Sequence, residues 1–151
     1  ARRYPDTRLW LGPGVERKRP DLVYEAVLGD LAPAPWRGQI DQLFFRGRPF
    51  ENEVVFRHRS SRTLVMCDLA FNFSPQAPPL TRAVTKIIGG FGQLEPSRLD
   101  PWLIRDRGAA RDCMEQILDW DFDRVIIAHG EVLERGGPET LRRGYRWLLE
   151  G

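Results

Sequence analysis

Hydrophobic and polar positions divide the chain into a turn-rich beginning and a β-rich middle. In the first forty residues a short apolar piece at 9–11 is followed by "GPG" and later by "LAPAPWRG", so glycine and proline leave no room for a long element. From Ile40 onward, the runs "IDQLFFR", "NEVVFRH" and "RTLVMCD" are rich in β-branched and aromatic residues, which predicts three strands. The polar link "RSSR" predicts an antiparallel hairpin between the second and third strands.

The second half of the chain shows helical periodicity and then ends in a strand and a helix. The apolar spacing in "LTRAVTKII" predicts a helix that "GGFG" terminates. A second periodic run predicts a helix over about residues 107–120. "DRVIIAH" then predicts a buried strand, and "PETLRRGYRWLLE" predicts a closing helix with Pro138 in its first turn. We therefore expect an α/β fold with a mixed or mainly antiparallel sheet and flanking helices.

Length and charge narrow the class of protein. With 151 residues, of which 42% are hydrophobic and 29% charged, the chain is long enough for one domain with its own core. We expect residues 1–151 to form a single domain or the C-terminal part of a larger one, because the start lacks Met and resembles a helix tail entering a Pro-Asp turn. The net charge of +2 indicates neither a nucleic-acid partner nor a membrane surface.

Cysteine usage and hydropathy favour a soluble, cytoplasmic protein. Cys67 and Cys113 are isolated, so they form neither a disulfide framework nor a cysteine-rich zinc site. No apolar run approaches the roughly 20 residues that a membrane-spanning helix requires. Because Cys67 lies near the end of an apolar strand, we expect a buried, unreactive thiol there.

Two polar residues stand at the exits of predicted strands. "TLVMC" ends at Asp68, and "VIIA" ends at His129. In α/β sheets, ligands collect outside the carboxyl ends of strands, so Asp68 and His129 are candidate metal ligands for zinc, iron or manganese. The alternative is structural: a histidine after a strand can bond a nearby carbonyl, and an aspartate there can cap the next turn. The pattern alone leaves both interpretations open.

The same segments resemble a known superfamily. "TLVMCDLAFNF" is similar to the strand-Asp-hydrophobe-Phe segment of the metallo-β-lactamase superfamily, and "RVIIAHGE" is similar to its last motif, a strand that ends in a metal-binding histidine. Together with "ARRYPDTRLWLGPGVERKRPDL" and "GQIDQLFFRG", these motifs resemble the C-terminal part of an uncharacterised bacterial family related to that superfamily. The resemblance implies the second half of an αββα sandwich. It also implies that Asp68 bridges two metals and that His129 is the final histidine ligand.

Departures from the superfamily pattern leave two functions to weigh. The signature His-x-His-x-Asp-His cluster is not in this chain, residues 49–53 contain no histidine, and His58 does not substitute by motif. The first hypothesis is a metal-dependent hydrolase of an unknown small molecule, active only when the N-terminal half is present and not as this chain alone. The alternative is a metal-free binding or structural domain that retains the fold without catalysis.

Other features carry weaker expectations. "RHRSSR" predicts either an anion site or, more simply, a solvated hairpin tip, and its serines beside His58 do not make a catalytic triad. Trp120 and Trp147 fit the core faces of helices. If the chain is half of a sandwich, uncovered apolar surface should lead to self-association or pairing with the missing half. The candidate residues for that surface are Phe71, Phe73, Phe91 and Trp102.

Overall fold

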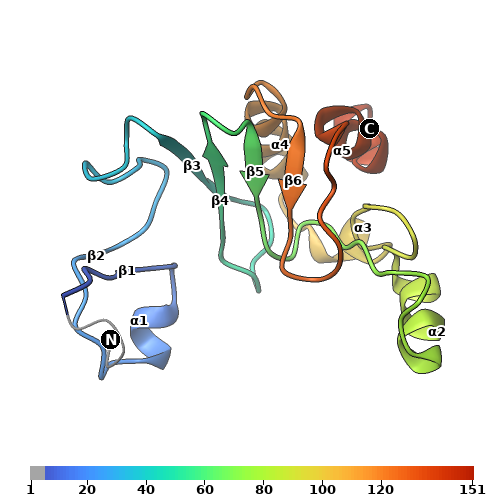
Figure 1. Ribbon diagram of the computed structural model, residues 1–151, viewed down its shortest axis with the longest axis horizontal. Coiled ribbons are helices and arrows are strands. Elements are labelled where there is room, and N and C mark those ends of the chain that lie inside the picture. Colours follow the sequence, from blue (N-terminus) through green and yellow to red (C-terminus); the bar gives the residue numbers. More distant parts are fainter. Residues whose placement is uncertain (1–5) are drawn as a thin grey trace.

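A four-stranded sheet organises the molecule, whose computed structural model describes residues 6–151. The strand order is β3 (Ile40–Phe45), β4 (Glu53–His58), β5 (Thr63–Val65) and β6 (Arg124–Ile126). The β3–β4 and β4–β5 pairs are antiparallel, whereas β5 and β6 are parallel (Figure 1). The α/β class with a mainly antiparallel sheet and the predicted β4–β5 hairpin are therefore confirmed.

Residues 6–39 form only short elements, as the glycines and prolines of this part of the chain predict. Strands β1 (Trp10–Leu11) and β2 (Ala26–Val27) pair in parallel, and the single-turn helix α1 (Val15–Lys18) lies between them in the chain. Figure 1 shows this part beside the edge strand β3.

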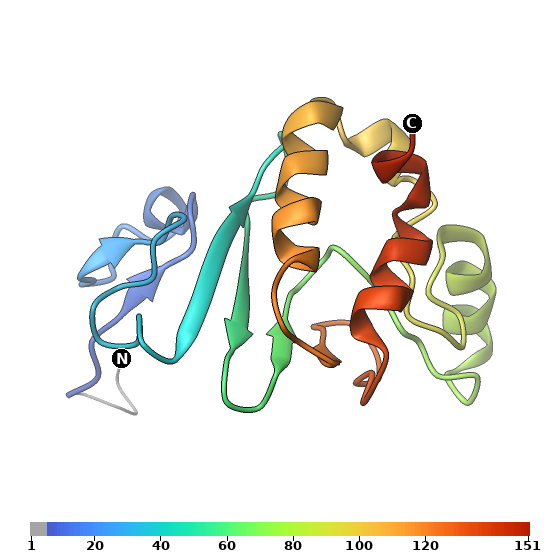
Figure 2. The ribbon, with the colours of Figure 1, turned by 90° about the horizontal axis from the view of Figure 1, so that it is seen from above.

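Helices cover one face of the sheet. Helix α4 (Arg107–Leu118) packs on β3, and it also contacts α5 (Gly137–Gly144) and α6 (Arg146–Leu149), as Figure 2 shows. Helix α4 confirms the predicted helix, and the side chain of Asp106 caps it by accepting a hydrogen bond from the amide of Ala109 at 3.0 Å. The predicted closing helix is divided in two at Tyr145, whose side chain is fully buried.

The other two helices lie at the far end of the sheet from β1 and β2. Helix α2 (Pro79–Ile88) confirms the predicted helix, and Gly89 of "GGFG" is its C-cap. The short helix α3 (Asp100–Leu103) was not predicted. Both lie beyond β6 in Figure 1.

The two faces of the sheet differ in their burial. Leu43, Val55, Leu64 and Val125 are buried between the sheet and the helices. The row Phe44, Val54, Phe56 and Val65 on the opposite face is half-buried, and Ile126 beside it is 37% exposed. Within residues 6–151, no helix covers this open face.

The residues expected to expose apolar surface divide into two groups. Trp102 is 70% exposed, whereas Phe71, Phe73 and Phe91 are half-buried. Trp120 and Trp147 pack against the core, which confirms that expectation. Self-association stays a prediction.

Candidate functional site

The candidate site lies where β5 and β6 end. Because these strands are parallel and Val65 pairs with Ile126, their carboxyl ends emerge side by side. The chain then brings Asp68 and His129 together, with Nε2 of His129 3.0 Å from Oδ1 of Asp68. Two residues sixty-one positions apart in the sequence thus form one polar pair at the edge of the sheet.

Aromatic rings flank this pair. The Phe71 ring stacks on the imidazole of His129, with ring centroids 5.8 Å apart and an interplanar angle of 25°. Phe73 stacks on Phe71 in turn, at 6.1 Å and 8°. The His129 side chain is still 51% exposed and that of Asp68 44% exposed. Solvent and small solutes can therefore reach both side chains while the aromatic stack limits the rotation of the imidazole.

Buried polar groups fix the backbone that carries Asp68. The carboxylate of Glu53, at the start of β4, accepts hydrogen bonds from the amides of Cys67 and Asp68 at 2.6 and 2.9 Å. Arg48 donates through Nη1 to the carbonyl oxygen of Asp68 at 3.1 Å. The hydroxyl of Tyr145 donates to the carbonyl oxygen of Leu69 at 2.7 Å. Three consecutive residues are held by side chains from three other parts of the chain, so the position of Asp68 is set by the folded core.

The buried Asp100 connects two of these side chains, Arg48 and Tyr145. Arg48 pairs with the fully buried Asp100 at 3.1 Å, and Oδ2 of Asp100 lies 3.2 Å from the Tyr145 hydroxyl, whose single proton is shared between Asp100 and the nearer Leu69 carbonyl. Burial raises the pKa of Asp100 to about 6, although the Arg48 charge and the Tyr145 hydrogen bond oppose this. Burial likewise raises the pKa of Glu53, opposed by the two amides that it accepts from.

The backbone that carries His129 is held by Asn72. The amide of Asn72 donates to the carbonyl oxygen of His129 at 3.1 Å, and the amide of Glu131 donates to the carbonyl oxygen of Asn72 at 2.7 Å. Gly130 lies between these bonds with φ 125°, and a Cβ there would lie 2.1 Å from that same carbonyl oxygen. The glycine after His129 is therefore required by the close approach of the two loops.

Cys67 differs from its prediction. The thiol is exposed rather than buried, because β5 ends at Val65 and the chain leaves the ladder before Cys67. Only the amide of Met66 extends the pairing, to the carbonyl oxygen of Ile126 at 3.0 Å. Partial burial and the nearby Asp68 and Glu53 carboxylates raise the pKa of the thiol, so low nucleophilicity is still expected for a different reason.

Few side chains in residues 6–151 are placed to coordinate a metal together. Among residues 6–151, no group of three or more histidine, cysteine, aspartate or glutamate side chains is placed to hold an ion. In the segment 49–53, where the superfamily pattern expects a histidine, Glu53 is bonded to backbone amides and Glu51 lies 2.9 Å from Arg48. His58 lies at the hairpin tip, with Nδ1 2.7 Å from the Ser61 hydroxyl. Asp68 and His129 are thus the donors that the described chain brings together.

The arginines of "RHRSSR" do not form an anion site. Arg57 and Arg59 both pair with Asp41, and Arg62 pairs with Asp121 at 2.8 Å. Their charges are already compensated, which favours the interpretation of a solvated hairpin tip.

Four buried side chains that hold the loop of Asp68 are not among the predicted site residues, namely Arg48, Glu53, Asp100 and Tyr145. One signal was present for Glu53, a single acidic residue inside the β-rich run "NEVVFRH". No local pattern identifies the other three, because their partners lie far away in the sequence.

Comparison with known proteins does not assign a family. The chain matches no protein-family model, and no curated protein is significantly similar to it.

No helix in residues 6–151 has the length and apolar composition needed to cross a bilayer.

Proposed function

We propose that Asp68 and His129 supply two ligands of a divalent metal site in a metallo-β-lactamase-like hydrolase. The remaining ligands of this site would come from outside residues 6–151. The observation that carries the proposal is the 3.0 Å approach of Nε2 of His129 to Oδ1 of Asp68 at the adjacent ends of two parallel strands.

The geometry of the pair is compatible with a shared ion. Imidazole nitrogen and carboxylate oxygen each lie about 2.0–2.2 Å from zinc, so two such ligands on one tetrahedral ion are separated by about 3.3–3.6 Å. The observed separation of 3.0 Å is that of a direct pair, so a shared ion requires the two groups to move apart by a few tenths of an ångström, and both side chains are accessible to solvent. Two donors are fewer than the three or four protein ligands that zinc sites use, so this chain alone is expected to bind metal weakly.

The chain's own residues would hold and orient the ion. A bound divalent metal would supply Lewis-acid chemistry for hydrolysis of an ester or amide-like substrate. Glu53 and Arg48 would keep the Asp68 carboxylate in place through the backbone, and Phe71 would hold the His129 ring.

Metal content tests the proposal. The protein with its full encoded sequence, including whatever precedes Ala1, would be purified without chelators and analysed for zinc, iron and manganese. We expect at least one equivalent per chain, and we expect Asp68→Ala and His129→Ala each to lower metal affinity by more than about tenfold. His58→Ala is the matched control, because it removes the other histidine from the opposite end of β4. Substoichiometric metal, or an equal loss in the control, would refute the proposal.

A second candidate is a metal-free binding or structural domain. The observation that favours it is that Asp68 and His129 contact each other directly. Glu53 accepts hydrogen bonds from backbone amides, and Glu51 forms an ion pair with Arg48. Under this function Asp68→Ala and His129→Ala would each change the free energy of unfolding by only about 1 kcal/mol, the value of a lost hydrogen bond. The metal measurement above separates the two candidates.

A further inference from the structure

A cavity of about 400 Å³ lies between the loop after α2 and the helices α5 and α6. One wall consists of residues 93–98 with Pro101, and the other wall consists of Thr140, Arg143, Gly144 and Trp147. The walls meet closely at Gly144, where an added Cβ would lie 2.5 Å from the ring of Pro96. The volume is within the range of sites that bind small molecules.

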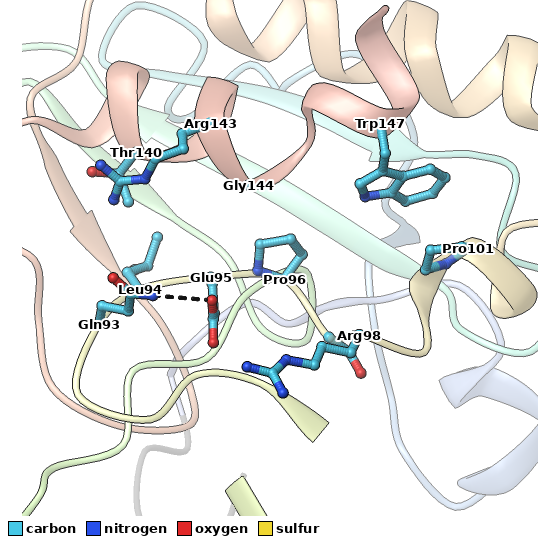
Figure 3. A pocket seen from close by; sticks show the side chains of 11 residues that line it. Gln93, Leu94, Glu95, Pro96, Arg98, Pro101, Thr140, Arg143, Gly144 and Trp147 are labelled. Carbon is cyan, nitrogen blue, oxygen red and sulfur yellow. Dashed lines mark hydrogen bonds between the residues drawn. The ribbon is translucent and has the colours of Figure 1, made fainter. Parts of the chain in front are cut away.

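The cavity has an aromatic end and a charged end. Figure 3 shows the indole of Trp147 beside Pro101 at one end and the side chains of Arg143 and Thr140 at the other, with Pro96 between them. In the same view, the Arg98 side chain points from the loop toward Glu95. A flat apolar group would fit against Trp147, and a polar group would reach the arginines.

Hydrogen-bond donors remain available at the charged end. Within residues 6–151, the Arg143 guanidinium and the Thr140 hydroxyl have no hydrogen-bond or ion-pair partner, and Arg98 uses only Nη1, which donates to the carbonyl oxygen of Lys86 at 2.9 Å. Within residues 6–151 Glu95 forms no ion pair with either arginine; its carboxylate accepts from the Gly90 amide at 2.8 Å and from the Gln93 amide group at 3.2 Å, so the cavity lining carries two guanidinium charges and one carboxylate charge. The Arg143 guanidinium with its free donors attracts an anion, since arginine binds carboxylate and phosphate in a bidentate way, and Arg98 adds a second positive charge on the opposite wall.

We propose that this cavity binds a small organic anion with a flat apolar group, the anion at Arg143 and Thr140 and the flat group against Trp147. The cavity also adjoins the candidate site. The backbone of Glu95 pairs with that of Phe71 through two hydrogen bonds of 2.9 and 3.0 Å, and the Phe71 ring stacks on His129. The backbone-paired residues Glu95 and Phe71 therefore connect the cavity to His129. The proposal does not depend on a metal at Asp68.

Binding of 2-naphthoate, with the neutral 2-naphthamide as its isostere, tests the proposal by titration calorimetry and by the indole N–H signal of Trp147 in NMR spectra. We expect naphthoate to bind at least about tenfold more tightly than naphthamide. Arg143→Gln should remove this preference, and Trp147→Leu should weaken both ligands. Arg142→Gln is the matched control, since Arg142 is the preceding, exposed arginine of α5 and does not line the cavity.

Three results would overturn the proposal. The first is that naphthoate does not bind at millimolar concentration to the folded wild-type protein. The second is that both compounds bind equally well. The third is that Arg142→Gln and Arg143→Gln weaken naphthoate to the same extent, which would indicate attraction to the general positive charge of α5. Signals from Trp10, Trp36, Trp102 and Trp120 report whether binding is confined to the cavity.

Discussion

The two ends of the sheet both present histidine, aspartate and arginine side chains, but they hold them in different ways. At the hairpin tip between β4 and β5, His58 bonds Ser61 three residues away, and the arginines pair with Asp41 and Asp121 near the surface. At the other end, the loop with Asp68 is held by Glu53, Arg48 and Tyr145, which are all buried.

This difference indicates which end of the sheet holds its polar side chains in fixed positions, as a functional site requires. At the tip, the side chains of Arg59 and Arg62 are about half exposed, so water can replace much of a lost contact with Asp41 or Asp121. Burying an arginine, an aspartate and a tyrosine hydroxyl behind the other end carries a desolvation cost, which their hydrogen bonds offset in part, while Nε of Arg48 is left without a partner in residues 6–151. That arrangement gives Asp68 and His129 a fixed relative position, as a binding or catalytic pair requires.

The largest loss of stability is expected when the buried Arg48 is replaced. Arg48→Met would leave the Asp100 carboxylate without its ion-pair partner and the Asp68 carbonyl without its donor. We expect a loss of about 3–5 kcal/mol in the free energy of unfolding, measured by urea denaturation. Arg59→Met at the tip should cost no more than about 1 kcal/mol, because Arg59 is about half exposed and Asp41 keeps its ion pair with Arg57. Similar losses in the two variants would remove the distinction between the ends.

The two ends should also respond to pH in opposite directions. The folded-state pKa of Asp100 is raised to about 6, so the folded state binds more protons than the unfolded one between about pH 4 and 6. The contribution of Asp100 to stability is therefore fully present below about pH 4 and is lost as the pH rises through 6. The difference between its ordinary value of 3.8 and about 6 corresponds to about 3 kcal/mol.

The pKa of Asp41 at the tip is shifted in the opposite direction to that of Asp100. The Arg59 and Arg57 side chains hold its pKa below the ordinary value, so its contribution is present at neutral pH and is lost as the pH falls through the lowered folded-state pKa. Carbon-13 NMR titration of the two carboxyl groups measures both directions in one sample. A pKa of Asp100 at or below that of Asp41 would contradict the assignment of burial to the former.

A single hydroxyl gives a smaller and cleaner test of the same network. Tyr145→Phe keeps the buried ring and removes the hydrogen bonds to the Leu69 carbonyl and to Asp100. We expect a loss of about 1–3 kcal/mol in the free energy of unfolding, because a buried carbonyl oxygen is left without a donor. Tyr24→Phe is the matched control, since Tyr24 is 40% exposed and should show almost no change. Equal effects would mean that the Tyr145 hydroxyl contributes little to holding the loop.

The sequence predicts the local parts of this comparison and misses the long-range ones. The β4–β5 hairpin and helices α2 and α4 follow from periodicity and turn residues within single segments, and all three are present. The approach of Asp68 to His129 was anticipated because each residue follows a strand. Arg48, Asp100 and Tyr145 carry no local signal, because they act on backbone groups and side chains 20 to 76 residues away.

The failed prediction at Cys67 has the same origin. An apolar run indicates that a strand is present, but the point at which the ladder ends depends on the partner strand, and β6 supplies only three paired residues. Exposure of Cys67 therefore follows from the length of β6, which the sequence around Cys67 does not contain.

The smallest expected effect compares the two histidines directly. His129→Ala removes an exposed pair with Asp68 and an aromatic contact with Phe71, and His58→Ala removes a hydrogen bond to Ser61. Because both side chains are accessible to water, we expect each variant to lose no more than about 1 kcal/mol in thermal or urea unfolding. If His129→Ala instead costs several kcal/mol while His58→Ala does not, the imidazole of His129 is part of the structural support of the loop. A small and equal loss would leave His129 free to serve a ligand, because the loop would then be held by Glu53, Arg48 and Tyr145 without it.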